Sequence, residues 1–448
     1  MKKNEVASGW GIGKIFQSVF ISQICFISLP VFLFAQSDVP TPAPKQSQSI
    51  YLTHATVHSG NGKVLNDATV AFENGKIVFV GESPSFKTDA TMGKVIDCTG
   101  KHIYPGIIAP NTKLGLTEVE AIRATNDYAE TGGYNPNVRA AISYNTDSRV
   151  TPTIRSNGVL YAQIVPQGGT VSGTSAVVQL DAWNWEDALV KEDGIWLNWP
   201  SLQSGGGWWA EPAASKENKD YEKQVRAIKD YFREAKSYSL EVAHKKANLR
   251  FDAMKGLFNG TRKLFVNASR VKEMQHAVAF AEELGMQVVI AGGRESFLIA
   301  DELAQKNVAV MLDNPHSLPA YPEEDIDQPY KTPAQLQKAG VLFCLSIPGG
   351  FWQERNLMFE AGTAAAYGLT KEEALASITS NTAKILGIDK TIGTIETGKA
   401  ATLIVSTGDV LDMRTSNIEH AFIDGREIDL DNKQKELNRK FMKKYGLN

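Results

Sequence analysis

The sequence predicts an α/β protein whose central part forms a (β/α)8 barrel of the TIM type. The main observation is an alternation over residues 107–386. Short apolar runs, typical of buried parallel strands, alternate there with longer segments whose apolar residues recur at helical spacing. A second observation is that β-hairpin signals stand on both sides of this region, so both chain ends are expected to be β-rich.

Length and composition describe an ordinary globular protein. The chain has 448 residues, of which 43% are hydrophobic and 22% are charged. It is long enough to bury one large core and a smaller one. The formal net charge is −3, so the chain has no excess of basic residues, and nucleic acid is not expected as a partner.

The N-terminus predicts export. Lys2, Lys3 and Lys14 precede an apolar stretch at residues 15–35, and a small residue, Ala35, ends it. This pattern is typical of a signal peptide over residues 1–35, which places the mature protein in the periplasm or outside the cell. The alternative is an uncleaved membrane anchor, because the stretch is long enough to span a bilayer. Residues 36–49 are rich in Pro, Ser and Gln and are expected to form a flexible linker.

Cysteine usage excludes a zinc knuckle and a disulfide framework. Only Cys98 and Cys344 remain after removal of the signal peptide, and they are far apart in the sequence. Two buried thiols are favoured over a single disulfide.

The elements follow in order along the chain. Asn61-Gly62 and Asn74-Gly75 are hairpin turns within residues 50–105, and Asp424-Gly425 is another near the C-terminus. Between them, the strand-like runs are residues 158–165, 176–180, 262–266, 287–291, 308–312 and 341–346. The helix-like segments are residues 271–284, 297–305, 356–367 and 371–386. Residues 431–448 are expected to be a polar helix or tail.

A tryptophan-rich stretch interrupts this alternation. Six of the eight tryptophans lie within residues 183–209, and charged helical sequence follows up to residue 259. We predict a Trp-rich insertion over residues 183–260. Its tryptophans are expected to pack this lobe against the barrel rather than to form an aromatic wall over a pocket.

Several motifs resemble the amidohydrolase superfamily, in particular its imidazolonepropionase-like branch. Residues 105–113 read P-G-I-I-A-P-N-T-K, similar to the P-G-[LI]-I-D-x-H-x-H that opens the barrel in that family. Residues 168–176 resemble a glycine-rich stretch of the branch. Residues 379–387 match T-x-N-x-A-x-x-L-G, and residues 393–399 match G-x-[IL]-x-x-G-K. The order and spacing of these motifs cover nearly the whole mature chain.

The resemblance implies a composite β-sandwich domain of residues 50–105 plus 387–430, around a barrel of residues 106–386. It implies hydrolysis of non-peptide or cyclic C–N (amide) bonds in a small molecule. In that family one or two divalent ions, zinc or another metal, lie at the carboxyl-terminal mouth of the barrel and activate water.

The residues expected to bind this metal are replaced. Asn111 and Lys113 stand at the positions of the two histidines, and an amide or an ammonium group is a poor metal ligand. Asn267 stands at the strand-five position, residues 289–293 contain no histidine, and residues 343–350 lack the expected Asp. We therefore expect a degenerate site with no bound metal and no cofactor.

No catalytic residue is assigned from the sequence. The residues predicted to line the pocket are Asn111, Lys113, Asn267, Arg294, His316 and Arg355. Arg294 and Arg355 follow the sixth and eighth strands, where they could bind an anion, and His316 follows the seventh strand near the pocket rim.

Three functions remain open. The first is an exported C–N hydrolase. The second is a non-catalytic paralogue that binds a small molecule or a partner, including association with an intact amidohydrolase homologue. The third is metal-free catalysis in which the Lys113 ammonium replaces the cation. The sequence leaves a homo-oligomer open.

Overall fold

The structure, a computed structural model, describes residues 40–85, 93–204, 216–241, 246–319 and 324–447. These residues belong to one compact unit, residues 38–448. The predicted signal peptide lies outside the described residues. Within the described ranges, no helix is long and apolar enough to cross a membrane.

An eight-stranded sheet forms the centre of the molecule, in the order β15-β14-β13-β12-β9-β8-β7-β6. Its strands are β6 (Ile107–Thr112), β7 (Val159–Ile164), β8 (Val171–Gln179), β9 (Leu189–Asn198), β12 (Lys263–Ala268), β13 (Val288–Gly292), β14 (Ala309–Asp313) and β15 (Phe343–Ser346). The first and last strands, β6 and β15, lie side by side, so the sheet is nearly closed. The predicted eight-stranded α/β barrel is confirmed at this level.

One strand departs from the predicted (β/α)8 repeat. β8 runs antiparallel to both β7 and β9, whereas the other neighbouring strands are parallel. Gly168 and Gly169 turn the chain between β7 and β8, with φ angles of 84° and 64°. A Cβ atom at Gly169 would lie 2.9 Å from the carbonyl oxygen of Gly132. Because this connection is too short for a crossover helix, the chain reverses direction.

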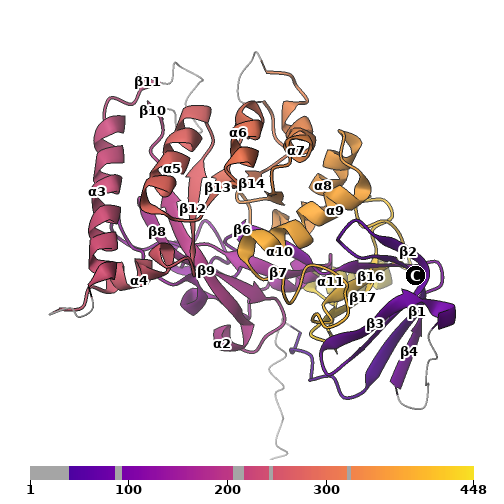
Figure 1. The fold of residues 1–448 in the computed structure, drawn as a ribbon. Helices are drawn as coiled ribbons and strands as arrows, with labels where there is room; N and C mark the ends of the chain where they lie inside the picture. Colours follow the sequence, from indigo (N-terminus) through magenta and orange to yellow (C-terminus); the bar gives the residue numbers. More distant parts are fainter. Residues whose placement is uncertain (1–39, 86–92, 205–215, 242–245, 320–323, 448) are drawn as a thin grey trace, which may run out of the picture. The chain divides into compact units, whose positions relative to one another are not determined.

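Helices lie along the outer side of the sheet (Figure 1). They are α1 (Thr151–Arg155), α2 (Trp185–Ala188), α3 (Tyr221–Leu240), α4 (Leu249–Phe258), α5 (Val271–Leu284), α6 (Ala300–Gln305), α7 (Gln328–Ala339), α8 (Leu357–Ala366), α9 (Lys371–Ser377) and α10 (Ser380–Leu386). The C-terminal helix is α11 (Lys433–Tyr445). A two-stranded sheet, β10 (Gln203–Ser204) with β11 (Lys216–Glu217), precedes α3.

Both chain ends build a second sheet of eight strands. β1 (Ser49–His58), β2 (Val64–Glu73), β3 (Lys76–Glu82), β4 (Gly93–Asp97) and β5 (His102–Pro105) come from the N-terminal side. β16 (Leu403–Ser406), β17 (Ile418–Ile423) and β18 (Arg426–Glu427) come from the C-terminal side, and β16 pairs with β5. The joining of the two ends agrees with the expectation, but the sandwich arrangement remains a prediction. A separate apolar cluster that includes Leu52, Phe72 and Phe422 forms the core of this sheet.

The predicted linker residues that the structure describes are bound to the body. The backbone of Ala43 hydrogen bonds to Asp181 and Arg426. Asp181 is fully buried and also accepts from Arg155 at 2.6 Å and from Arg426 at 2.8 Å. This buried ion network joins the N-terminal segment, α1 and β18.

The tryptophan-rich region differs from a simple insertion, because it contains the barrel strand β9. Trp196 is buried and stacks on Phe265, and Trp199 is buried and donates its indole N–H to the Tyr221 hydroxyl at 3.1 Å. These two residues pack as expected. Trp183 is exposed, and Trp208 and Trp209 lie outside the described residues. Cys98 and Cys344 are free buried thiols, as predicted.

Candidate functional site

Three polar side chains meet where neighbouring strands end at the mouth of the barrel. Asn111 lies near the end of β6, Asp313 ends β14 and Ser346 ends β15. The Ser346 hydroxyl donates to Asp313 Oδ1 at 2.6 Å, and the Asn111 Nδ2 lies 3.5 Å from the same oxygen. Carboxyl ends of barrel strands are where active sites of this architecture form.

A chain of hydrogen bonds in the barrel interior holds the backbone of Asn111 in place. Asn111 has a left-handed backbone with φ of 54°, a conformation that Asn tolerates better than most residues. Its backbone N–H donates to Gln163 Oε1 at 3.1 Å, and Gln163 Nε2 donates to Asp193 Oδ2 at 2.5 Å. Burial raises the pKa of Asp193, which also accepts from Ser175 at 2.7 Å. The barrel interior thus supports the geometry at its mouth.

Asp313 is the titratable group best suited to proton transfer at this mouth. Part of the residue reaches the surface, but its carboxyl is buried deeply enough to raise its pKa to about 6. The hydrogen bonds from Ser346 and Asn111 and the charge of Arg294 oppose this shift. A carboxyl with a pKa near neutrality can exchange a proton under physiological conditions.

Two further acids lie close to Asp313. Glu354 follows β15 and is fully buried, and neither of its carboxyl oxygens forms a hydrogen bond of good geometry, although Thr112 lies near it. Glu360 lies in α8 and is 5% exposed. Burial and the neighbouring carboxyl groups raise the pKa of Glu354 far above its usual range, and they raise that of Glu360 to about 8. The Glu360 side chain is therefore mostly protonated at pH 7.

Glu360→Gln is expected to stabilise the protein at pH 8, by on the order of 3 kcal/mol, but not at pH 4.5. The folded state holds the Glu360 proton up to about pH 8, whereas the unfolded chain releases it near pH 4.5. The free energy of unfolding of the wild type therefore falls as pH rises between these values. Urea unfolding at several pH values measures this difference. A variant whose stability stays parallel to that of the wild type contradicts the assignment.

The structure brings together three of the six predicted pocket residues. Asn111 contacts Asp313, and the exposed Arg294 lies near enough to lower the pKa of Asp313. The backbone N–H of His316 faces the Glu360 carboxyl, and its ring Nε2 lies 2.6 Å from the Thr363 hydroxyl. Burial of the ring lowers the pKa of His316.

The other three predicted residues are engaged elsewhere. Lys113 pairs with Glu120 at 3.0 Å and lies 5.0 Å from the centre of the Tyr128 ring. Asn267 is exposed and donates to Asn198 at 3.3 Å. Arg355 lies over the Trp352 ring at 5.4 Å. No contact of these three residues links them to Asp313, so their role in a pocket remains a prediction.

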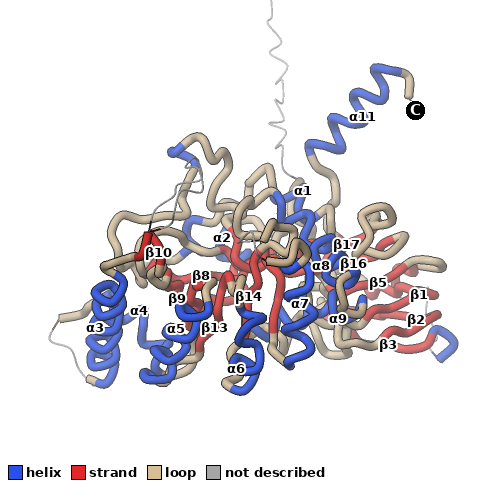
Figure 2. The backbone as a smooth tube through the Cα atoms, turned by 90° about the horizontal axis from the view of Figure 1, so that it is seen from above, coloured by secondary structure: helices blue, strands red, loops and turns tan. Residues whose placement is uncertain are grey.

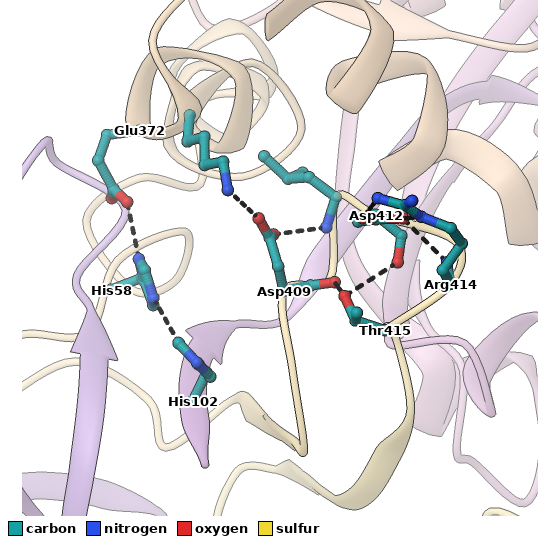
Figure 3. Close-up of polar contacts among 9 residues, drawn as sticks. His58, His102, Glu372, Asp409, Asp412, Arg414 and Thr415 are labelled. Atoms are coloured by element: carbon teal, nitrogen blue, oxygen red, sulfur yellow. Dashed lines mark hydrogen bonds and ion pairs between the residues drawn. The ribbon is translucent and has the colours of Figure 1, made fainter. Parts of the chain in front are cut away.

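A second polar cluster lies between the β-rich sheet and α9. His58 Nδ1 lies 2.7 Å from Glu372, and His58 Nε2 lies 3.0 Å from His102 Nδ1 (Figure 3). Burial and the charge of His58 lower the pKa of His102. The cluster borders a cavity of about 140 Å3, next to a larger pocket of about 720 Å3. Neither cavity includes a residue of the barrel mouth, so this cluster joins the two parts of the fold instead of completing the site.

Comparisons with known proteins agree with this geometry. The sequence model of the amidohydrolase family matches residues 344–428. The imidazolonepropionase of Rhizobium rhizogenes is 24% identical over 375 residues, which cover 77% of this chain and 87% of that protein. The imidazolonepropionase of Agrobacterium fabrum is 27% identical over 387 residues, which cover 76% of this chain and 84% of that protein.

A solved structure extends the match over the whole fold. The crystal structure of an amidohydrolase from Thermotoga maritima superposes with a TM-score of 0.73 and 26% identity, covering 85% of this chain and 99% of that chain. The chain is therefore similar to the amidohydrolase superfamily. Its sequence relatives are imidazolonepropionases, which supports a resemblance to the imidazolonepropionase-like branch. Molinate hydrolase, with a TM-score of 0.53 and 13% identity, shows the same fold only.

The similarity to metal-using homologues corrects the expectation that no cofactor is used. Amidohydrolases normally employ a divalent metal, so the expectation of none, drawn from Asn111 and Lys113, is wrong for a chain with these relatives. Among the described residues, however, no group of three or more His, Cys, Asp or Glu side chains is placed to hold a metal ion. The described donors therefore do not fit the family's ion, and no reaction step is derived through it.

Sequence reasoning missed the three acids of the mouth. The resemblance places the expected Asp after the eighth strand, where this chain has Ile347 and Pro348, and therefore does not point to Asp313. The structure places the Asp313 carboxyl beside the end of that strand, from the strand before it. A useful signal was available, since Asp313 directly follows an apolar run.

Proposed function

We propose that this protein cleaves an amide-type C–N bond of a small molecule at the barrel mouth, with Asp313 as the proton-transferring group. The observation that carries this proposal is the position of Asp313 at the end of β14, with a pKa of about 6 and two oriented hydrogen-bond donors. The imidazolonepropionase relatives make an imidazolone-type cyclic amide the first substrate to test.

The residues of the mouth support a division of roles. The Asp313 carboxylate takes a proton from the attacking water and passes it to the departing nitrogen. Ser346 and Asn111 fix the orientation of the carboxylate, and the Arg294 charge keeps a fraction of it ionised near neutral pH. The raised pKa values of Glu354 and Glu360 favour their protonated forms, which add no negative charge beside Asp313.

Hydrolysis measurements with the purified full-length chain test the proposal. Release of product from an imidazolone-type cyclic amide and from a panel of small amides is measured as purified, after chelation, and after reloading with zinc or manganese. We expect product release from at least one of these substrates. Turnover that chelation removes and reloading restores assigns the reaction to a metal ion, as in the superfamily, whereas turnover that survives chelation assigns it to the protein's own groups; Asp313 is the proton-transferring group in both cases. Absence of turnover under all three conditions refutes the proposal.

A second candidate function is a non-catalytic paralogue that binds a small molecule or associates with an intact homologue. The pairing of Lys113 with Glu120, at a position where the family has a metal ligand, favours it. In that case the same substrates bind, as measured by calorimetry, but are not converted. A degenerate metal site belongs to this candidate.

Export is also a proposal. It rests on the basic and apolar sequence of residues 1–35, and we infer a periplasmic or secreted protein, with a membrane-anchored form as the alternative. Detection of the mature N-terminus by mass spectrometry of the purified protein distinguishes the two.

A further inference from the structure

We propose that the C-terminal helix α11 binds the surface of a membrane that contains anionic lipids. The helix covers Lys433–Tyr445, and none of its residues is buried. Figure 2 shows it extending away from the other elements of the structure. Most of the stability of a helix in a protein comes from the packing of its apolar face. An apolar face that is left exposed on α11 therefore indicates a surface that binds a partner.

The helix carries an apolar stripe. Leu437, Phe441 and Tyr445 recur every four residues and therefore lie on one face. They are 38%, 47% and 64% exposed. The Phe441 and Tyr445 rings stack with their centres 6.5 Å apart, which makes the stripe continuous. Aromatic residues with one polar end, such as Tyr, favour the boundary between headgroups and acyl chains.

The rest of the helix surface is strongly basic. Between residues 433 and 445 there are six Lys or Arg residues and one Glu, a formal net charge of +5 in a chain whose total charge is −3. Two of these residues are engaged in ion pairs, Lys433 with Glu436 and Arg439 with Asp431. Lys440 and Lys443 are exposed, and neither pairs with an acidic residue within the described ranges. Basic and apolar faces on one helix of low mean hydropathy are typical of helices that lie in a membrane interface.

The base of the helix is fixed to the barrel. Asn432 is buried, caps the helix by accepting from the backbone N–H of Lys435 at 2.9 Å, and donates to Ser156 at 2.9 Å. Thr153 donates to Gln434 at 2.7 Å. Ser156 lies two residues before Gly158, whose carbonyl pairs with Ile107 at the start of β6. The helix therefore leaves from the end of the barrel opposite its mouth, and membrane binding there keeps the mouth accessible.

Charge identifies the occupant of this face. A second copy of the helix would bring another +5 against it, and like charges at such short range oppose association. An anionic lipid surface offers apolar depth for the stripe and negative charge for the lysines at the same time. A nucleic acid supplies the negative charge but has no apolar layer to accept the stripe.

The experiment measures hydrogen–deuterium exchange of residues 433–447 in the full-length chain, with vesicles of phosphatidylglycerol and phosphatidylcholine in equal parts or of phosphatidylcholine alone. The readout is local, so binding through the N-terminal segment does not imitate it. We expect exchange in α11 to slow by about tenfold or more with the anionic vesicles only, and the effect to weaken as salt increases. Phe441→Ser is expected to weaken binding about tenfold, and Lys440→Gln with Lys443→Gln by about 25-fold.

Leu249→Ser serves as the matched control, because Leu249 is 71% exposed but lies in α4. This variant is expected to bind like the wild type. Equal protection of α11 by both kinds of vesicle, or none with either, overturns the proposal. Protection that rises with protein concentration in the absence of vesicles also overturns it and assigns the face to a second copy of the chain.

Discussion

Asp313→Asn is expected to lower kcat by about a hundredfold or more without unfolding the protein. The amide keeps the size and most contacts of the carboxyl group, including acceptance from Ser346, but cannot take up a proton. Steady-state kinetics of the variant on the substrate found for the wild type measures the loss. Asp301→Asn, an exposed substitution in α6, is the control and is expected to retain full activity. A variant within threefold of the wild type would exclude Asp313 as the proton-transferring group.

The same assignment predicts the pH dependence of the wild type. Because the base must be ionised, kcat/KM is expected to rise with pH and level off above about pH 6, the pKa of Asp313. Arg294→Gln removes a charge that lowers this pKa, so the rise is expected to move to higher pH. A profile that does not move indicates that another group limits the rate.

Asp181→Ala is expected to lower the free energy of unfolding by about 3–5 kcal/mol. The Asp181 carboxyl is fully buried and accepts from Arg155 and Arg426, and the Arg155 side chain is only 3% exposed. Two nitrogens of the Arg155 guanidinium have no hydrogen-bond partner among the described residues. The Asp181 carboxylate is therefore the main group that balances the buried charge of Arg155. Urea unfolding at pH 7 measures the change.

An exposed pair provides the matched control for this loss. Asp412 binds Arg414 at 2.7 Å, but the Arg414 side chain is 83% exposed. Asp412→Ala is therefore expected to cost much less than Asp181→Ala, because solvent screens an exposed pair. If Asp181→Ala costs no more than Asp412→Ala, the buried network does not hold the N-terminal segment to the barrel.

The sequence predicts those parts of the fold that depend on local periodicity. Residues 271–284 were expected to be a helix, and α5 has the same bounds. The direction of a strand could not be predicted in this way, because an apolar run such as residues 176–180 has the same pattern in a parallel and in an antiparallel strand. The reversal at β8 depends on the short connection through Gly168 and Gly169, which the sequence marks only as a loop.

The candidate site could be predicted less well than the fold. Asn111 was found because a motif placed it, and it does contact the central acid of the mouth. Lys113 belonged to the same motif, but its ammonium turns to Glu120, a partner seven residues along the chain that no pattern singled out. Glu354 and Glu360 resemble ordinary helix-surface acids in the sequence, and only the tertiary packing shows that they are buried.

The reversed strand β8 has a consequence for substrate choice. In a (β/α)8 barrel every strand is followed at the mouth by a loop that leads to a helix, whereas here a tight turn joins β7 to β8, so this sector of the rim lacks such a loop. Residues 113–150 cross this sector, and bridges from Tyr134 to Val171 and from Arg139 to Thr174 hold them there. Under the proposed function, residues 113–150 are the segment that borders this side of the mouth, and exchanging them between homologues is expected to alter which substrates are accepted.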